Sequence, residues 1–240
     1  MTGSTRASRA PRNFLSRARV VEAAFEFADA HGLDALTIRA VAARLGVKPM
    51  SLYRHVANKD ELLDALVERM YAEFETPDPQ LPDWRGELRS RANSVREVLV
   101  RHPWSIALIE TRTGPDRPFT FAHAEAVLAT LISAGCSPRV ASRAFVVLDS
   151  FAYGFAVQQV TMPSTNPEEV VTDGFVAAME PYPSLVAARG AVLADASYDF
   201  VAEFDAGLDL VLDGIDRWRG ADASPPRTSE AGAVGPGLNS

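Results

Sequence analysis

Apolar residues recur three and four positions apart along most of this chain, which is the period of an α-helix with one buried face. In the first run Val20, Ala24 and Phe25 share one face, and the run ends at Gly32, a common helix stop. The alternating pattern of a β-strand is absent from the sequence, and the β-branched residues fall within helical runs. The pattern therefore predicts an all-α protein.

Two short helices joined by a tight turn are predicted between residues 37 and 56. Thr37 is a favourable N-cap for the first helix, and Gly46 ends it. Pro49 begins the second helix, where its missing N–H group costs nothing, and this helix is predicted to run through His55. Together with the helix before them they form a three-helix helix-turn-helix domain, in which the last helix can enter a DNA major groove.

A fourth helix is predicted to begin at Asn58, which forms a capping box with Glu61. Three prolines within residues 76–82 then interrupt the helical pattern and mark a connection between two parts of the chain. Beyond this connection helices are predicted at about 84–101, 103–112, 118–134, 138–162, 167–179, 184–194 and 197–219.

The two ends of the sequence lack helical periodicity. Residues 1–14 are polar and rich in arginine, and residues 220–240 have no apolar pattern. Segments of this kind bury too little apolar surface to fold on their own. We therefore predict a flexible basic arm at 1–14, a helix-turn-helix domain at 15–62, a larger helical domain at 63–219 and a disordered tail at 220–240.

Charge is divided unevenly along the chain. Residues 1–59 contain ten Arg and Lys against four Asp and Glu, a net charge of +6, whereas the remainder carries −13. A basic end on an acidic body is typical of a protein that contacts phosphate groups with one part only. A merely solvated basic tail has the same pattern, so charge alone leaves both interpretations open.

Reactive side chains form no pattern typical of catalysis or metal binding. Cys136 is the single cysteine, which excludes an intramolecular disulfide and a cysteine-rich zinc site and fits a reducing cytoplasm. The four histidines are scattered, without the spacing of a nucleophile–base or metal-ligand pair. No secretory signal is found, and no apolar run approaches the roughly 20 residues of a membrane span. The sequence therefore predicts neither an enzyme nor a membrane protein, and no cofactor or metal.

The outer side of the second short helix carries side chains that can donate or accept hydrogen bonds and stack on flat rings. Met50, Ser51, Tyr53, Arg54 and His55 lie on or near this side. Near the start of a helix, such groups can reach base edges and phosphates in a major groove. The alternatives are a half-buried packing aromatic for Tyr53, a cap or core contact for His55 and a solvated cation for Arg54.

The run LTIRAVAARLGVKPMSLYRHVANKDELLDAL resembles the N-terminal signature of the tetracycline-repressor (TetR) family, down to its Leu-Tyr-x-His-Val and Asn-Lys-x-x-Leu-Leu elements. The resemblance covers about residues 16–66 and is highly specific. It implies DNA contacts at the start of one helix, base reading by the first turn of the next and phosphate binding by three further side chains. In this order, the residues are Ile38 and Arg39; Lys48, Pro49, Met50 and Ser51; and Tyr53, His55 and Lys59.

Regulators that resemble this family are homodimers, and two predicted helices, 138–162 and 197–219, have the material for an interface. Apolar residues repeat at three and four in both, and Gly207 and Gly214 would let a partner helix approach closely. Two such helices from each chain would make a four-helix interface. A core stripe within one chain is the alternative. The predicted interface residues are Leu148, Phe151, Phe155, Phe204, Leu208, Val211 and Leu212.

The larger domain resembles the tetracycline-repressor-like C-terminal domain, including its Thr111-Arg112 step, and this implies a ligand cavity. Leu108 stands where tetracycline repressors have a metal-binding histidine, so we expect a different, largely apolar effector. Plain core packing is the alternative for each apolar residue of the predicted lining. That lining is Trp104, Leu108, Thr111, Phe121, Phe145, Asp149, Tyr153 and Gln158, with Glu110, Arg112 and His123 as further polar anchors.

Together these features predict a cytoplasmic transcriptional regulator, a homodimeric repressor that a small effector releases from a palindromic operator in double-stranded DNA. An activator or a ligand-independent regulator of the same fold is an alternative, because the direction of control depends on where the operator lies. An adaptor that no longer binds DNA is another, although four intact residues argue against it, namely Arg39, Tyr53, His55 and Lys59.

Overall fold

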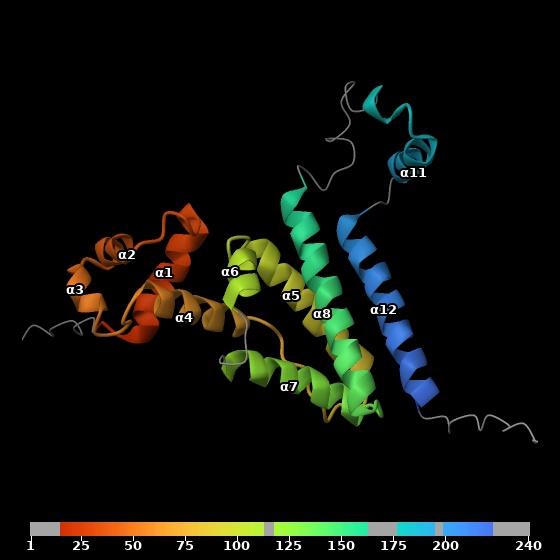
Figure 1. The fold of residues 1–240 in the computed structure, drawn as a ribbon, viewed down its shortest axis with the longest axis horizontal. Coiled ribbons are helices and arrows are strands. Elements are labelled where there is room, and N and C mark those ends of the chain that lie inside the picture. The colour runs from red at the N-terminus through yellow and green to blue at the C-terminus, as the bar shows by residue number, and fades with distance from the viewer. Residues whose placement is uncertain (1–14, 113–117, 163–176, 195–198, 223–240) are drawn as a thin grey trace, which may run out of the picture.

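The computed structural model describes residues 15–112, 118–162, 177–194 and 199–222, and all the regular elements in these ranges are helices. The predicted all-α class is confirmed. Figure 1 shows α1 to α4 at one end of the molecule and α5 to α12 making up the rest. The helices are α1 Arg17–His31, α2 Ile38–Leu45, α3 Pro49–Leu52, α4 Lys59–Tyr71, α5 Trp84–Arg101, α6 Ser105–Arg112, α7 Pro118–Ser133, α8 Pro138–Thr161, α11 Pro183–Ala194 and α12 Phe200–Asp222.

Polar side chains begin the helices of the N-terminal end as the sequence predicts. The Thr37 hydroxyl accepts a hydrogen bond from the Ala40 N–H (3.1 Å), and the Asn58 side chain accepts one from the Glu61 N–H (2.8 Å). The Glu61 carboxylate reaches back to the Ala57 N–H (2.6 Å). These bonds satisfy backbone N–H groups that have no partner within their helices.

Helix α3 is shorter than predicted. It ends at Leu52, and residues 53–55 form a turn instead of continuing to His55 as helix. The His55 N–H donates to the carbonyl of Leu52, three residues back (2.8 Å), which closes a tighter turn than the four-residue spacing of an α-helix. The turn places Val56 in the core, where it is buried, and leaves Tyr53 pointing outward.

Helix α4 belongs to both parts of the molecule. It packs against α1 on one side and against α6 and α7 on the other. Leu62, Leu66 and Met70 are fully buried along its length. The predicted boundary after residue 62 therefore falls inside a continuous helix, which connects the helix-turn-helix to the body mechanically.

Helix α8 is the central helix of the body and packs against α5, α7 and α12. Small side chains at Ala141, Ala144, Ala152 and Ala156 are fully buried and let these neighbours approach closely. By length and composition α8 could cross a bilayer, although no membrane span was predicted. Its contacts on three sides identify it as a core helix.

Several predictions concern residues outside the described ranges. The arm at 1–14 and residues 223–240 of the predicted tail lie there. Of the helix predicted at 167–179, only 177–179 are described, and these are helical. The predicted tail begins too early, because α12 continues through Asp222.

Candidate nucleic-acid interface and ligand cavity

The turn between α2 and α3 fixes the direction of α3. Gly46 has φ +67°, in the left-handed region that glycine adopts without strain, and its N–H bonds the carbonyls of Ala42 and Ala43. Leu52 and Val56 are buried beside Val41 in the core. The opposite side of α3 is therefore left facing solvent.

The nine predicted DNA contacts lie at this end of the molecule, on α2, on α3 with the residue before it and the turn after it, and at the start of α4 (Figure 1). Met50 is 74% exposed and Tyr53 is 46% exposed. Tyr53 stacks on none of the described rings, so the packing alternative finds no support. Six of the nine are exposed, namely Arg39, Lys48, Pro49, Met50, Tyr53 and Lys59, and three are half-buried, namely Ile38, Ser51 and His55.

Cations among the predicted DNA contacts differ in ion pairing from other arginines of α1, α2 and α4. Arg17, Arg44 and Arg69 each pair with a glutamate, as in the Arg44–Glu26 contact of 2.6 Å. Within the described residues, Arg39, Lys48, Arg54 and Lys59 form no ion pair. An unpaired surface cation keeps its full charge for a phosphate group.

The predicted dimer residues occupy a different place from the one expected. Leu148, Phe204, Leu208 and Leu212 are fully buried within a single chain, between α8 and α12. Phe151 and Phe155 are partly buried and contact the Phe204 ring, each with centroids 5.1 Å apart, and Val211 packs on the same core. A side chain added at Gly207 would lie 2.8 Å from the Phe151 ring. This stripe is the internal core of α8 and α12, the alternative considered above.

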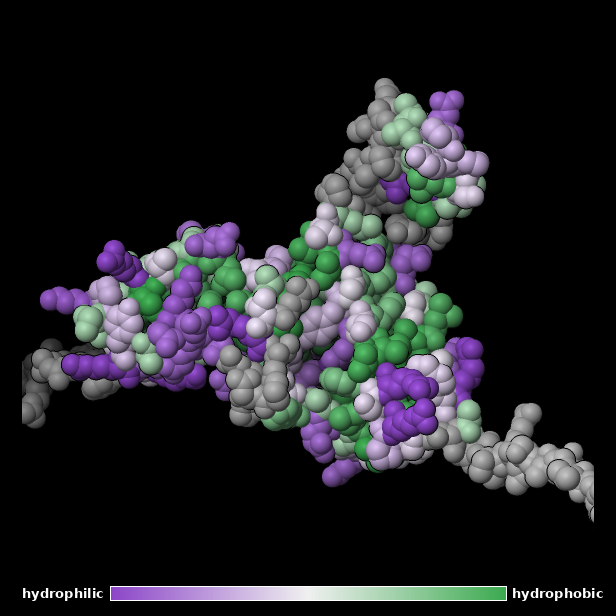
Figure 2. All heavy atoms as spheres, viewed as in Figure 1, coloured by the Kyte–Doolittle hydropathy of each residue, from purple (hydrophilic) through white to green (hydrophobic). Residues whose placement is uncertain are grey.

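A neighbouring stripe on the same two helices is apolar and exposed. Val146 is 58% exposed on α8, and Leu210 is 71% exposed on α12. Figure 2 shows hydrophobic side chains gathered over these helices, whereas the helix-turn-helix end is mostly hydrophilic. We name this surface the α8–α12 face; its members are Val146, Val147, Ser150 and Gly154 on α8 and Ala206 and Leu210 on α12.

A cavity of about 470 Å³ lies between α4, α6, α7 and α8. Four predicted lining residues, Phe121, Phe145, Asp149 and Tyr153, are part of its wall. A second hollow of about 530 Å³ shares Asp149 and Tyr153 with the first and includes the predicted Gln158. The wall of the first cavity is Tyr71, Ile109, Thr120, Phe121, His123, Ala124, Phe145, Asp149 and Tyr153.

Three predicted lining residues are absent from these walls. The Trp104 indole N–H donates to Asp29 of α1 (2.7 Å), which turns the ring away from the cavity. Leu108 is buried in the core, and the Thr111 hydroxyl donates to the Ala107 carbonyl (2.8 Å). For Leu108 and Thr111 the cause is that α6 packs on α4, so only one side of this short helix can meet the cavity.

Ile109, Thr120 and Ala124 of the wall were not predicted as binding residues, nor were two polar residues, Tyr71 and Arg91. Tyr71 ends α4 and reaches the wall from there. Arg91 lies directly behind the wall, and it is fully buried on α5. The signal for Arg91 was present in the sequence, because it shares a helical stripe with Leu88, Ala92 and Val95, where a charge has to be paired.

Arg91, His123 and Asp149 form a buried polar cluster beside the cavity. The Arg91 Nε–H donates to His123 Nε2 (3.1 Å), and Arg91 Nη2 lies 2.5 Å from the same nitrogen and 2.7 Å from Asp149 Oδ1. Burial, with the charge of Arg91, lowers the pKa of His123 to about 3. Burial also raises the pKa of Asp149, although Arg91 opposes this. His123 is therefore neutral near pH 7.

Beside this cluster, two tyrosines complete the polar end of the cavity. The Tyr153 hydroxyl lies 3.5 Å from that of Tyr71, the length limit of a hydrogen bond. Burial raises the pKa of both phenols, and that of Tyr153 most. Both hydroxyls therefore keep their protons, and the Tyr153 hydroxyl donates to the Tyr71 oxygen.

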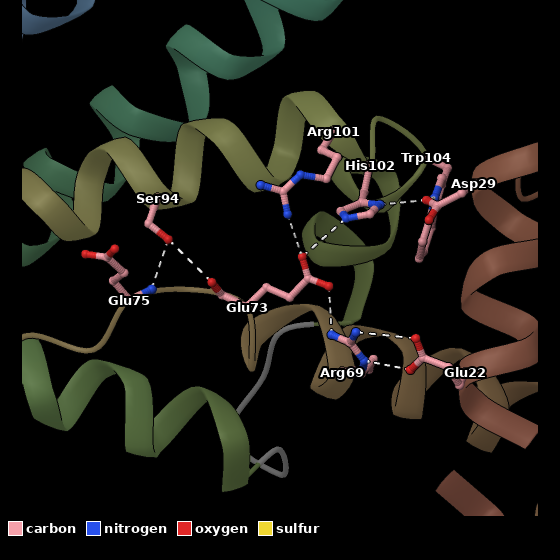
Figure 3. Close-up of polar contacts among 9 residues, drawn as sticks. All are labelled: Glu22, Asp29, Arg69, Glu73, Glu75, Ser94, Arg101, His102 and Trp104. Atoms are coloured by element: carbon pink, nitrogen blue, oxygen red, sulfur yellow. Dashed lines mark hydrogen bonds and ion pairs between the residues drawn. The ribbon is translucent and has the colours of Figure 1, made fainter. Parts of the chain in front are cut away.

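A network of side chains joins the helix-turn-helix to the body (Figure 3). His102 at the end of α5 lies between two carboxylates, with Nδ1 2.6 Å from Asp29 and Nε2 3.3 Å from Glu73. Arg69 of α4 contacts the same Glu73 (2.7 Å), and Trp104 bonds the same Asp29. The first helix is thus tied to the body directly and not only through α4.

Arg112 adds a second tie, from the end of α6 to α4. Its Nη1 donates to Asp64 and its Nη2 to Asp60, both at 2.7 Å. Arg112 was predicted as a polar anchor of the ligand, but its guanidinium is used here by two carboxylates. The end of α6 is therefore held against the first turn and a half of α4.

Comparisons with known proteins agree with both parts of the fold. Residues 20–66 match the bacterial regulatory proteins of the tetR family, and residues 76–218 match the tetracyclin repressor-like C-terminal domain. The chain is 36% identical over 222 residues to the HTH-type transcriptional repressor DrrR1 of Streptomyces coeruleorubidus, covering 88% of this chain and 81% of the relative. It is 31% identical to the class C tetracycline repressor protein of Escherichia coli, over 86% and 93% of the two chains.

Solved structures give the same picture. The TetR family protein ActR of Streptomyces coelicolor, in complex with actinorhodin, superposes with a TM-score of 0.70 at 27% identity, covering 86% of this chain and 99% of ActR. ActR without ligand superposes with a TM-score of 0.72, over 90% of this chain and all of ActR. This chain thus has the fold of a protein that has been solved in complex with a small molecule.

Proposed function

This chain belongs to the tetracycline-repressor (TetR) family of bacterial regulatory proteins, whose members are ligand-responsive DNA-binding repressors, and we propose that it acts as a homodimer on a palindromic operator. Each chain supplies one helix-turn-helix. The two α3 helices of a dimer have to lie roughly 34–36 Å apart to enter successive major grooves. Its place of action is the cytoplasm, where the operator DNA is.

The unpaired cations around α3 carry this proposal. Arg39, Lys48 and Lys59 are exposed and have no described carboxylate partner, while Arg44 close by is neutralised by Glu26. We propose that Arg39, Tyr53, His55 and Lys59 bind phosphates. The base edges are then read by the leading turn of α3, together with Ile38; this turn comprises Lys48, Pro49, Met50 and Ser51.

A matched pair of arginine variants tests the DNA surface. In Arg39→Ala, affinity for duplex DNA from the chain's own promoter should fall about tenfold, and the salt dependence of binding should lose about one released ion. Arg44→Ala removes an arginine that is already paired, so affinity should stay within about twofold. Fluorescence anisotropy at several salt concentrations measures both quantities. Equal losses in the two variants would contradict the assignment.

The α8–α12 face is the proposed dimer interface. Its three large side chains, Val146, Val147 and Leu210, are apolar and exposed in a single chain, and a second copy would bury them in a four-helix arrangement. Leu210→Asp should therefore yield a folded monomer that no longer binds the operator. Leu81→Asp, at a residue 49% exposed in the α4–α5 connection, is the control and should stay dimeric. Light scattering after gel filtration decides, and a dimeric Leu210→Asp protein would refute this interface.

Ligand release follows from the position of the cavity. Tyr71 of α4 and Ile109 of α6 both line it, and Arg112 ties these two helices together. An effector that fits the cavity better in one α4 position than in another shifts the population toward that position. Because α4 carries the helix-turn-helix, a small shift changes the α3 spacing, and the operator is lost.

A further inference from the structure

His102 is a buried ring with a carboxylate at each of its two nitrogens (Figure 3). It lies at the end of α5 and is 5% exposed, and the rings of Phe25 and Trp104 pack on it with centroids 4.7 Å and 6.3 Å away. Its Nδ1 lies 2.6 Å from Asp29 of α1, and its Nε2 lies 3.3 Å from Glu73, just after α4. One imidazole therefore joins the first helix of the helix-turn-helix to the body.

A neutral imidazole satisfies only one of these two contacts. It has one N–H and one lone pair, whereas an ionised carboxylate can only accept. The nitrogen without a proton would face a carboxylate oxygen with no donor between them, and the burial of the ring leaves little room for water to bridge. An imidazolium has an N–H on both nitrogens and donates to both carboxylates. The geometry is thus that of a doubly protonated ring.

The charges around the ring balance on the same condition. Arg69 pairs with Glu22 (2.9 Å) and with Glu73 (2.7 Å), and Arg101 pairs with Glu73 (2.9 Å). Together with Asp29 these groups hold three negative and two positive charges, so the set is neutral only when the ring supplies a third positive charge. We name the set the α1 latch; its members are Glu22 and Asp29 of α1, Arg69 of α4, Glu73, and Arg101 and His102 at the end of α5.

The α1 latch can position the helix-turn-helix without touching DNA. None of the nine predicted DNA contacts belongs to it. Helix α4 is the covalent connection between the two parts, and the latch adds a second contact, from α1. A closed latch narrows the range of positions that the helix-turn-helix can take on the body. With the latch open, fewer dimers present their α3 helices at the spacing that the operator needs, and the apparent affinity falls by that fraction.

We propose that His102 is a positioning residue that makes operator binding sensitive to protons. Doubly protonated, it holds α1 on the body; as the pH rises through the range in which histidine changes charge, about 5 to 8, the ring loses one proton and the latch opens. The inference rests on the proposed function for its effect on DNA. A proton on His102 favours this fold, whereas one on the buried His123 opposes it, so variants are needed to separate the two.

Nitrogen NMR of the full-length, histidine-labelled protein tests the ring itself. At about pH 5.5 His102 should carry slowly exchanging protons on both nitrogens, and at about pH 8 on one. The signal is assigned by its absence from His102→Gln or, where that variant does not fold, by its shift in Asp29→Asn. The exposed His31 is the internal control for fast exchange. A single ring proton at the lower pH, or exchange as fast as that of His31, would overturn the inference.

Operator binding tests the positioning. Between about pH 5.5 and pH 8, the affinity of the wild type for duplex DNA from the chain's own promoter should fall about tenfold more than that of His102→Gln. Titration of His55, a proposed phosphate contact, is common to both proteins and cancels in the comparison. Fluorescence anisotropy across the pH range measures this. Equal pH profiles, or a wild-type affinity that rises relative to the variant, would contradict the role of His102.

Two carboxylate variants of α1 separate the latch from a general effect of charge. Asp29→Asn keeps an acceptor for the Trp104 N–H but removes the charge that the imidazolium faces, so its pH profile should be as flat as that of His102→Gln. Glu26→Gln removes a carboxylate of the same helix that pairs with Arg44, and it should keep the wild-type profile. A wild-type profile in Asp29→Asn or a flat profile in Glu26→Gln would refute the latch.

Failure of this inference differs from failure of the proposed function. If the protein binds no operator DNA at any pH, the proposed function is wrong, and the two ring protons still decide whether the latch exists. If it binds the operator with one pH profile in the wild type and in His102→Gln, the positioning by His102 is wrong and the proposed function stands.

Discussion

Arginines in the two parts of this molecule differ in burial and in partners. Around α3, Arg39 and Arg54 stand in solvent without a described partner. In the body, Arg91 is fully buried against His123 and Asp149, and Arg96 is 5% exposed, with its guanidinium over the Phe204 ring and one nitrogen on Gln159.

The difference separates a solvated arginine, which is available to a ligand, from a buried arginine, which orients the side chains around it. A solvated guanidinium contributes little to folding and keeps its charge for phosphate. A buried guanidinium has lost its hydration, so its neighbours must compensate the charge. Removing each kind of arginine should therefore damage a different property.

The largest expected effect is on stability, from Arg91. Arg91→Met leaves Asp149 without its buried partner, and breaking such a pair costs about 3–5 kcal/mol of unfolding free energy. Arg39→Met, at an exposed residue, should change stability by less than about 0.5 kcal/mol. Urea denaturation of the two variants beside the wild type measures this. Similar losses would erase the distinction drawn above.

A smaller effect is expected from pH, through His123. Burial lowers its pKa to about 3, so between pH 6.5 and 3 the unfolded chain binds a proton that the folded chain does not. The free energy of unfolding should therefore fall as pH drops below 6.5, by up to about 1.4 kcal/mol per pH unit. Asp149 opposes this, because its raised pKa lets the folded chain take up a proton first.

Denaturation of three proteins between pH 7 and 5 isolates the His123 contribution. His123→Phe should show a flatter pH dependence than the wild type, since the group that titrates differently is gone. His31→Gln changes an exposed histidine on α1 and should keep the wild-type slope. If the His123→Phe protein also keeps that slope, the ring is protonated in the folded state and the described environment is wrong.

The smallest expected effect lies where the two regions meet. Trp104→Phe keeps a ring beside Phe25 but removes the N–H that donates to Asp29, a loss of about 1 kcal/mol. Trp218→Phe, at a half-buried ring of α12, is the control with no such bond in the described structure and should lose less. Thermal unfolding ranks the two. A larger loss in the control would mean that the Asp29 contact does not hold α1 to the body.

The helix starts and stops of the helix-turn-helix were predictable, because they depend on residues close together in the sequence. The caps at Thr37 and Asn58 and the stop at Gly46 act on backbone groups within a few residues, so their positions follow from short-range chemistry. The end of α3 was missed because a single turn at residues 53–55 depends on burying Val56, a contact with the rest of the domain.

The α8 and α12 stripes show where a helical period stops being informative. On each helix a buried apolar residue lies two positions from an exposed one: Leu148 beside Val146 on α8, and Leu208 beside Leu210 on α12. Periodicity identifies the apolar sides of a helix but not the helix that covers each side. The buried stripe was therefore assigned to a partner chain, although it packs inside one.

By itself the sequence determined the all-α class, the helix-turn-helix with its predicted DNA contacts, and the family, because these depend on neighbours in the chain and on a contiguous motif. Only the tertiary structure decided which apolar stripe is core, which of the predicted lining residues meet the cavity, and that Arg91 lies behind His123. Those facts depend on residues from α4, α5, α7 and α8 coming together in the fold. The role of the Arg91 charge likewise depends on the partners that surround it in space.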